Sequence, residues 1–357
     1  MGVLVRKIDG YVMRTVGGAM FLVMMVVLSL DLIFAFIAEL DDIRNNYQIQ
    51  DALWYVFLTL PRRIYDYLPL GAFMGCLVGL GSMASSSELT VVRAAGVSLK
   101  RIVWSAMKPA LVIVVMGVLI GEYLAPPAER VAQSYKAVAL GAGSNVASAS
   151  GVWHKEGDSY IHLNAVQPNG VLHGVSRFQF DDDRQLLAAS FAERAIYQGD
   201  HWLLENVRTT SFEDDRTVRV DDRTLRWETG LSPGVLSVLI VKPENLSMTG
   251  LYTYATYLGE QSLNASRYWL AFWKKALMPL GTAVMVLVAI SFIFGPLRSV
   301  TMGFRVFTGL LVGLLFKYMQ DFLGPMSLVY GFNPMLAVLV PIAVSAVAGG
   351  ILMRRAG

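Results

Sequence analysis

The stretch VGGAMFLVMMVVLSLDLIFAFI, from Val16 to Ile37, contains a single charged residue, Asp31. A helix needs about 20 predominantly apolar residues to cross the hydrocarbon core of a bilayer. Five more apolar stretches follow, the second of them lengthened by the apolar run before it, and we predict that all six are transmembrane helices. The six stretches run from Val16 to Ile37, Leu68 to Met83, Ile102 to Ala125, Ala276 to Phe294, Val306 to Leu323 and Met335 to Met353.

A polar segment, residues 126–266, separates the first three apolar stretches from the last three. It alternates apolar and polar residues, as in Ser159–Leu163 and Ser176–Phe180, and clusters such as Asp181–Asp183 interrupt the alternation. Short alternating runs with turn residues between them predict a β-sandwich or jelly-roll-like domain. The predicted organisation is residues 1–125 with three helices, residues 126–266 with the β domain, and residues 267–357 with three helices. A short helix within Pro243–Gln261 is expected to return the chain to the fourth span.

Composition and charge place the chain in a membrane. Hydrophobic residues make up 55% of it, and the mean hydropathy is +0.50, which excludes an ordinary soluble enzyme. The first span is too long for a typical signal peptide, so we expect it to be retained. Basic residues near the span ends fall in alternate loops, which by the positive-inside rule predicts cytoplasmic termini and an extracytoplasmic insert. These residues are Arg6, Lys7, Arg14, Arg93, Lys100, Arg101, Arg298, Arg305, Arg354 and Arg355.

Motifs for catalysis are missing from the sequence. It has no G-x-x-x-x-G-K-[ST], G-x-S-x-G or H-E-x-x-H motif, and Cys76 is its one cysteine. The four histidines lack metal-ligand spacing and are interpreted as ordinary surface or core residues: His154, His162, His173 and His201. We therefore predict no catalytic residue, no metal site and no nucleic-acid partner, and any energy source must come from another protein.

Two spans contain glycines four residues apart. Gly71, Gly75 and Gly79 lie in the second span, and Gly309 and Gly313 lie in the fifth. Such spacing lets helix backbones approach closely. The contact could be within this chain or with a second subunit, and the sequence leaves both open.

Charges beside or within the spans are costly in a bilayer and therefore suggest a function. A collar of cations at the outer ends would suit an anionic head group, such as that of a phosphorylated lipid, although anchoring at the lipid surface is an alternative. Lys317 and Asp321 are four residues apart in the fifth span and could pair. The collar consists of Arg62, Arg63, Arg130, Lys136, Arg267, Lys274 and Lys275.

Four motifs resemble one family. They are LGSMASSSELTVVRAAG (Leu80–Gly96), IGEYLAP (Ile120–Pro126), SFIFGPLRSV (Ser291–Val300) and GPMSLVYG (Gly324–Gly331). Together with the three-plus-three layout, they are similar to the lipopolysaccharide export permeases of the LptF/LptG (YjgP/YjgQ) family. Within that family, the motif around Phe294–Val300 looks closer to the LptG branch.

The resemblance implies a permease subunit of an ABC transporter in the inner membrane of a Gram-negative bacterium, with a periplasmic β-jelly-roll domain. It implies a heterodimer with the LptF paralogue, a cytoplasmic LptB ATPase dimer and the single-span protein LptC. The complex would extract lipopolysaccharide and pass it to a periplasmic bridge. This chain would not be an enzyme and would hold no cofactor, since ATP and Mg²⁺ would bind the ATPase.

Site residues follow from the same resemblance. A cytoplasmic helix at about residues 84–98 would dock on the ATPase through Glu88, Leu89, Val92 and Arg93. Gly309 and Gly313 would pack at a lateral gate, which the family forms from the first and fifth spans of opposite subunits. Lipopolysaccharide phosphates would meet Arg62, Arg130, Lys136, Arg267, Lys275 and Lys317.

One departure from the family concerns lysines late in the first span and just after it. Here these positions hold Ala35, Asp41 and Asp42, so Arg44 or Lys317 would have to substitute for them.

The acyl chains of the exported lipid require shielding from water. Alternation predicts that Ile161, Leu163, Phe178 and Phe180 share one face, which would form an apolar interior for the lipid or simply a dry core.

Two other functions remain alternatives. A mechanotransmission-type ABC permease is disfavoured, because such permeases have four spans with the outer domain after the first. A non-transporting scaffold for periplasmic proteins is compatible with the sequence. A lipid-modifying transferase would need a carboxylate or histidine constellation at the membrane surface, and we find none in the sequence.

Overall fold

The computed structural model divides the chain into two compact units, which are described separately. The helix unit comprises Met1–Phe34, Pro61–Ala125 and Ser247–Gly357, and the second unit comprises Ala35–Leu60 and Pro126–Leu246. The structure describes residues 2–43, 47–140, 152–166, 171–181, 183–213, 216–231, 243–260, 264–295 and 300–356.

Six helices of the structure are long and apolar enough to span a membrane, which confirms the six predicted spans. The third of them continues from α5 through a π-helical turn, η1, into α6, a helix that the sequence analysis placed in the β domain. The spans are α1 (Gly2–Leu40), α3 (Leu60–Ser85), α5 (Leu99–Leu119) with η1 (Ile120–Leu124) and α6 (Ala125–Ala139), α9 (Ser266–Phe294), α10 (Met302–Tyr330) and α11 (Pro334–Ala356).

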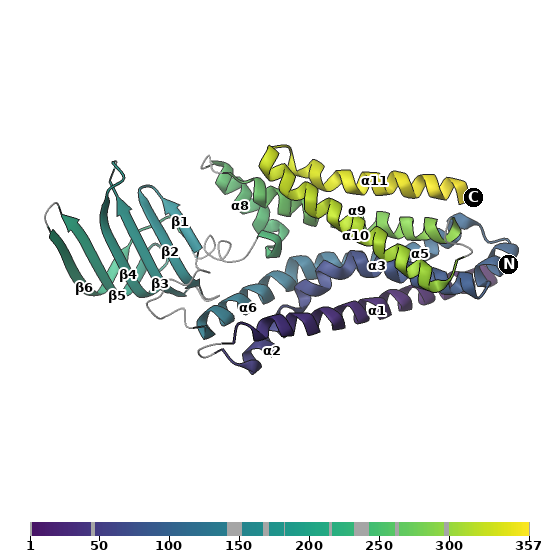
Figure 1. Ribbon diagram of the computed structural model, residues 1–357, viewed down its shortest axis with the longest axis horizontal. Helices are drawn as coiled ribbons and strands as arrows, with labels where there is room; N and C mark the ends of the chain where they lie inside the picture. The colour runs from purple at the N-terminus through teal and green to yellow at the C-terminus, as the bar shows by residue number, and fades with distance from the viewer. Residues whose placement is uncertain are drawn as a thin grey trace. The chain divides into compact units, whose positions relative to one another are not determined.

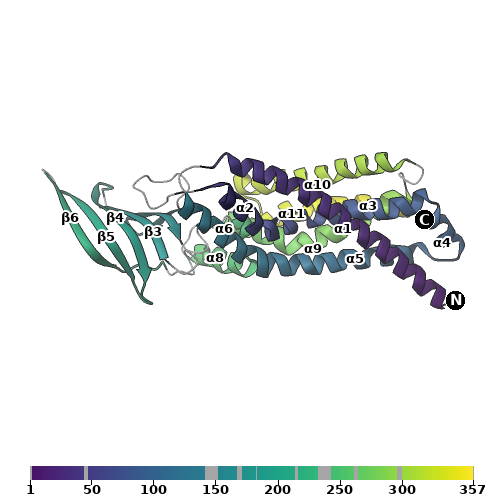
Figure 2. The ribbon, with the colours of Figure 1, turned by 90° about the horizontal axis from the view of Figure 1, so that it is seen from below.

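Shorter helices connect the spans. The helix α4 (Glu88–Ala94) follows α3, and α8 (Met248–Glu260) is the short helix that was predicted before the fourth span. The start of α1, the end of α11 and α4 lie at the same end of the helix unit (Figures 1 and 2). The prediction that both termini are cytoplasmic stays a prediction. The remaining short elements are α2 (Ile49–Leu58) and η2 (Pro243–Asn245).

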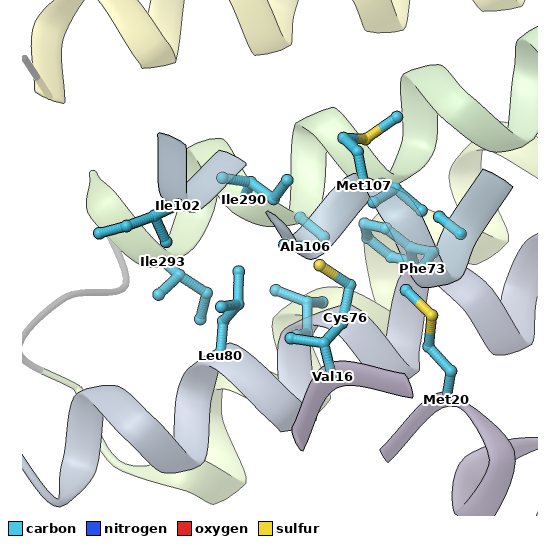
Figure 3. Packing of buried hydrophobic residues seen from close by; sticks show 14 of the residues in the cluster. Val16, Met20, Phe73, Cys76, Leu80, Ile102, Ala106, Met107, Ile290 and Ile293 are labelled. Atoms are coloured by element: carbon cyan, nitrogen blue, oxygen red, sulfur yellow. The ribbon is translucent and has the colours of Figure 1, made fainter. Parts of the chain in front are cut away.

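The largest buried cluster of the helix unit joins α1, α3, α5 and α9 (Figure 3). Cys76 lies at its centre and is completely buried. The apolar side chains of this cluster pack closely, and dispersion between them stabilises this part of the unit. The labelled members are Val16, Met20, Phe73, Cys76, Leu80, Ile102, Ala106, Met107, Ile290 and Ile293.

The glycines of α3 let α1 approach its backbone. A Cβ atom at Gly75 would collide with the Met20 backbone, and one at Gly79 would lie 2.9 Å from the Val16 Cα. At Gly71 the nearest atom would be the Met24 sulfur, at 3.1 Å. The sequence left open which helix meets this ladder, and the structure shows that α1 of the same chain does.

The glycines of α10 face α3 as well. A Cβ atom at Gly309 would collide with Leu77 and lie 3.2 Å from the Met74 sulfur. One at Gly313 would lie 3.0 Å from Leu70. Both glycines therefore serve packing within the chain in this structure.

The inserted β domain is confirmed, and its described strands form one antiparallel sheet of six strands in sequential order. Within the described residues it is a meander rather than two packed sheets (Figure 1). The strands are β1 (Val152–Glu156), β2 (Ser159–Val166), β3 (Val171–Phe180), β4 (Leu186–Tyr197), β5 (Trp202–Glu213) and β6 (Arg216–Trp227).

One face of the sheet carries the buried apolar cluster, and only part of the prediction about it holds. Ile161 and Leu163 belong to this cluster. Phe178 pairs with Tyr160, and Phe180 contacts the Tyr160 ring at 5.6 Å between centroids, so both phenylalanines lie on the opposite face. The prediction that all four share a face is wrong, because alternation within each strand does not fix the register between strands.

Two left-handed residues change which side chains face the cluster. Leu172 and Val175 are both buried in it although they are three residues apart, and Gly174 between them has a φ of 63°. In β5 the same spacing recurs across Leu204–Val207, with Asn206 at a φ of 53°. A residue in this conformation interrupts the two-residue alternation of an extended strand, so the same face stays apolar on both sides of it.

We predict that Gly75→Ala weakens the helix unit. The new methyl group would press on the Met20 backbone, which cannot move aside as a flexible side chain can. Overpacking of this kind costs about 1–3 kcal/mol. The unfolding midpoint in detergent should therefore fall.

Gly18→Ala is the matched control, because a Cβ atom at Gly18 of α1 meets no atom within 4 Å. It should leave the midpoint unchanged or raise it, since alanine favours a helix over glycine by about 1 kcal/mol. Equal midpoints for the two variants would contradict the packing described here.

Candidate functional site

The predicted coupling segment contains a short helix between two left-handed residues. The helix α4 runs over Glu88–Ala94, shorter than the predicted segment. Ser87 precedes it with a φ of 62°, and Gly96 follows it with a φ of 84°. A left-handed serine is strained, so the chain direction changes sharply where α3 gives way to α4.

The faces of α4 differ from the predicted contact set. Leu89 is buried, and Val92 packs against the main cluster, so both point into the helix unit. Arg93 is exposed, and Val91 is 66% exposed. The surface that α4 offers a partner therefore centres on Val91 and Arg93, with Glu88 at its start.

Polar contacts fix the start of α1 beside this helix. Tyr11 donates a hydrogen bond to Glu88, with 2.9 Å from Oη to Oε2. Asp9 accepts hydrogen bonds from Arg101, at 2.8 Å from Nη2, and from the Ser105 hydroxyl, at 3.0 Å. These pairs could not be predicted from the sequence, because residues about 80 to 100 positions apart show no pattern that would join them.

Within the second unit, Lys136 forms ion pairs with two carboxylates. Its Nζ forms ion pairs with Glu39 and, at 2.7 Å, with Asp42. It also lies over the Tyr55 ring, 4.8 Å from the centroid. Tyr47 donates a hydrogen bond to Glu39 at 2.8 Å, and burial together with this bond raises the pKa of Tyr47.

Lys275, unlike the partly buried Lys136, is buried, and it contacts the π-helical turn. Its Nζ donates a hydrogen bond to the Gly121 carbonyl at 3.2 Å and lies over the Tyr65 ring. The next residue, Glu122, accepts hydrogen bonds from the Met248 amide at 2.7 Å and from the Thr249 hydroxyl at 2.8 Å. A carboxylate at the start of α8 suits the positive end of that helix.

Arg62 and Arg63 both contact acids. Arg62 lies 3.8 Å from Asp66, with about a third of its side chain exposed. Arg63 forms a 2.7 Å ion pair with Asp31, which also accepts a hydrogen bond from Tyr67 at 2.8 Å. Asp31, the single charged residue between Val16 and Ile37, is thus paired with α3.

Three of the predicted phosphate-binding cations are exposed: Arg130, Arg267 and Lys317. Among the described residues no ion pair joins Lys317 to Asp321, so the pairing suggested by their spacing does not form. Arg44, the other suggested substitute, lies outside the described residues. The set of six predicted cations therefore separates into three that are exposed, one beside Asp66, and two that are held inside the protein.

The chain is similar to known proteins over nearly its whole length. The family described as "Lipopolysaccharide export system permease LptF/LptG" matches residues 10–355. The "Lipopolysaccharide export system permease protein LptG" of Escherichia coli (strain K12) is 34% identical over 341 residues, covering 94% of each chain. The protein of the same name from Haemophilus influenzae is 35% identical over 341 residues, covering 95% of each chain. The chain therefore belongs to the LptF/LptG family of lipopolysaccharide export system permeases.

Proposed function

We propose that this chain is a permease subunit of an ABC transporter that extracts lipopolysaccharide from the inner membrane and delivers it to a periplasmic bridge. In this proposal an LptF-type paralogue forms the other half of the membrane channel. An LptB-type ATPase dimer hydrolyses ATP on the cytoplasmic side, and an LptC-type single-span protein joins the complex. The insert is periplasmic, and both termini are cytoplasmic.

The observation that carries the proposal is the uneven covering of the spans. α3 and α9 are largely buried within the chain, whereas α1 and α10 are largely exposed. Phe21 and Phe34 on α1 are more than half exposed, and so are Leu315 and Phe322 on α10. The exposed faces of α1 and α10 are available to contact a partner permease subunit. A lipid could then enter between these spans and the partner.

Lys317 supports an anionic substrate. It is exposed on α10, within a span, where an uncompensated charge facing hydrocarbon would be costly. A water-filled channel that receives phosphate groups removes this cost. Arg267, exposed at the start of α9, offers a second cation on the same unit.

The direct test is lipopolysaccharide release from proteoliposomes to a soluble acceptor protein, with ATP as the energy source. We expect release only when this chain, its paralogue and the ATPase are all present. A non-hydrolysable ATP analogue should abolish release. Release that persists without this chain would exclude the permease function.

We predict that Glu88→Lys uncouples hydrolysis from transport. Reversing the charge would repel a basic contact on the ATPase and would also remove the acceptor for Tyr11. ATP hydrolysis and lipopolysaccharide release, measured on the same proteoliposomes, should show that release per ATP falls at least tenfold.

Tyr11→Phe separates the two effects of that change, because it removes the donor and keeps the carboxylate. If Glu88 contacts the ATPase, Tyr11→Phe should transport nearly as well as the wild type. Normal coupling in Glu88→Lys would remove this residue from the mechanism.

We predict that charge reversal at the exposed cations weakens substrate capture. Charge-assisted hydrogen bonds contribute about 1.5–3 kcal/mol each, so Arg267→Glu and Lys317→Glu should each lower photo-cross-linking to lipopolysaccharide roughly tenfold or more. Assembly should be unaffected, since both side chains are exposed.

Arg354→Glu is the matched control, because Arg354 is also exposed but lies at the other end of the spans. It should leave cross-linking unchanged. Equal cross-linking in all three variants would assign the cations to surface anchoring instead.

A further inference from the structure

A buried arginine joins two spans beside the coupling helix. Arg305 lies in the first turn of α10, and 2% of the residue is exposed. Its Nη1 donates hydrogen bonds to the Gly81 carbonyl at 2.5 Å and to the Ser85 hydroxyl at 2.8 Å. Burying a guanidinium is costly unless its donors are satisfied, so these contacts hold the side chain in one place.

The acceptors belong to the last turn of α3. The carbonyl groups of this turn carry the partial negative charge of the helix end, and the Gly81 carbonyl also accepts a hydrogen bond from the Ser85 hydroxyl at 2.8 Å. A cation from α10 is therefore well suited to this position. Side chains of α10 also pack against Gly81, because a Cβ atom there would lie 3.2 Å from the Met302 sulfur and 3.3 Å from the Arg305 Cδ.

The next residues along the chain lead directly into α4. α3 ends at Ser85 and α4 begins at Glu88, so Ser86 and the left-handed Ser87 are the whole connection. A connection this short gives α4 little freedom to move without the last turn of α3. Because Arg305 is hydrogen-bonded to that turn, a displacement of α4 would also displace α10.

We propose that Arg305 is a positioning residue of the transport cycle, which locks α10 to the last turn of α3 so that movement of α4 is passed to α10. This inference rests on the proposed function, in which α4 receives the movement of the ATPase. In the sequence analysis Arg305 served only as a topology signal, and its burial gives it this second role.

The test compares Arg305→Gln with the matched control Arg354→Gln, which removes an exposed arginine from the same end of the helix unit. Each variant complex is purified and reconstituted, and ATP hydrolysis and lipopolysaccharide release are measured together. We expect Arg305→Gln to assemble, to hydrolyse ATP, and to release at least tenfold less lipopolysaccharide per ATP. Arg305→Lys should recover part of the loss, and the control should match the wild type.

A wild-type ratio of release to hydrolysis in Arg305→Gln would overturn the inference. If that variant fails to assemble, Ser85→Ala decides, because it removes one acceptor and leaves the arginine in place. We then expect at least a twofold lower ratio, and an unchanged ratio would overturn the inference. Failure of the wild-type complex itself to release lipopolysaccharide with ATP would instead refute the proposed function, and the inference with it.

Discussion

The fold depends on the close approach of other backbones to α3. On one side Gly75 and Gly79 admit α1 so closely that a single added carbon would collide with it or press against it. On the other side Gly81, Gly309 and Gly313 bring α10 against the same helix. In a bilayer the hydrophobic effect does not drive helices together, so contacts of this kind and a few internal polar bonds have to hold the spans. The two most exposed spans, α1 and α10, thus both pack against α3.

Polar contacts also hold α1 and α10 against α3. At one end of α3, Arg63 pairs with Asp31 of α1, and at the other end Arg305 binds the last turn. The two exposed spans are therefore attached to α3 by both close packing and a buried or half-buried arginine. The helix α4 begins two residues after that last turn, so the proposed ATPase contact would lie next to the attachment of α10. Movement of α4 and substrate entry beside α10 would then be linked through α3.

The sequence predicted much of the fold because apolarity and glycine spacing are local signals. The span beginning at Val16 and the glycine ladder beginning at Gly71 could be predicted without knowing which residues they contact. The structure confirms both. The face of Phe178 could not be predicted, since it depends on register. For the candidate site, charge alone could not separate exposed from neutralised cations. Lys136 meets Asp42 across 94 residues of sequence, and Lys275 meets Gly121 across 154.

If Arg305 holds the two spans together, α3 and α10 move as one body at their α4 end. The most direct measurement joins them covalently with cysteines at Gly81 and Met302, in a Cys76→Ala background, and records ATP-dependent lipopolysaccharide release before and after reduction. The two side-chain positions meet in the structure, with 3.2 Å between a Cβ at Gly81 and the Met302 sulfur. If the two helices move together, the oxidised, cross-linked complex should transport as well as the reduced one. Transport that stops on oxidation and returns on reduction would show that the two helices must separate, and would contradict it.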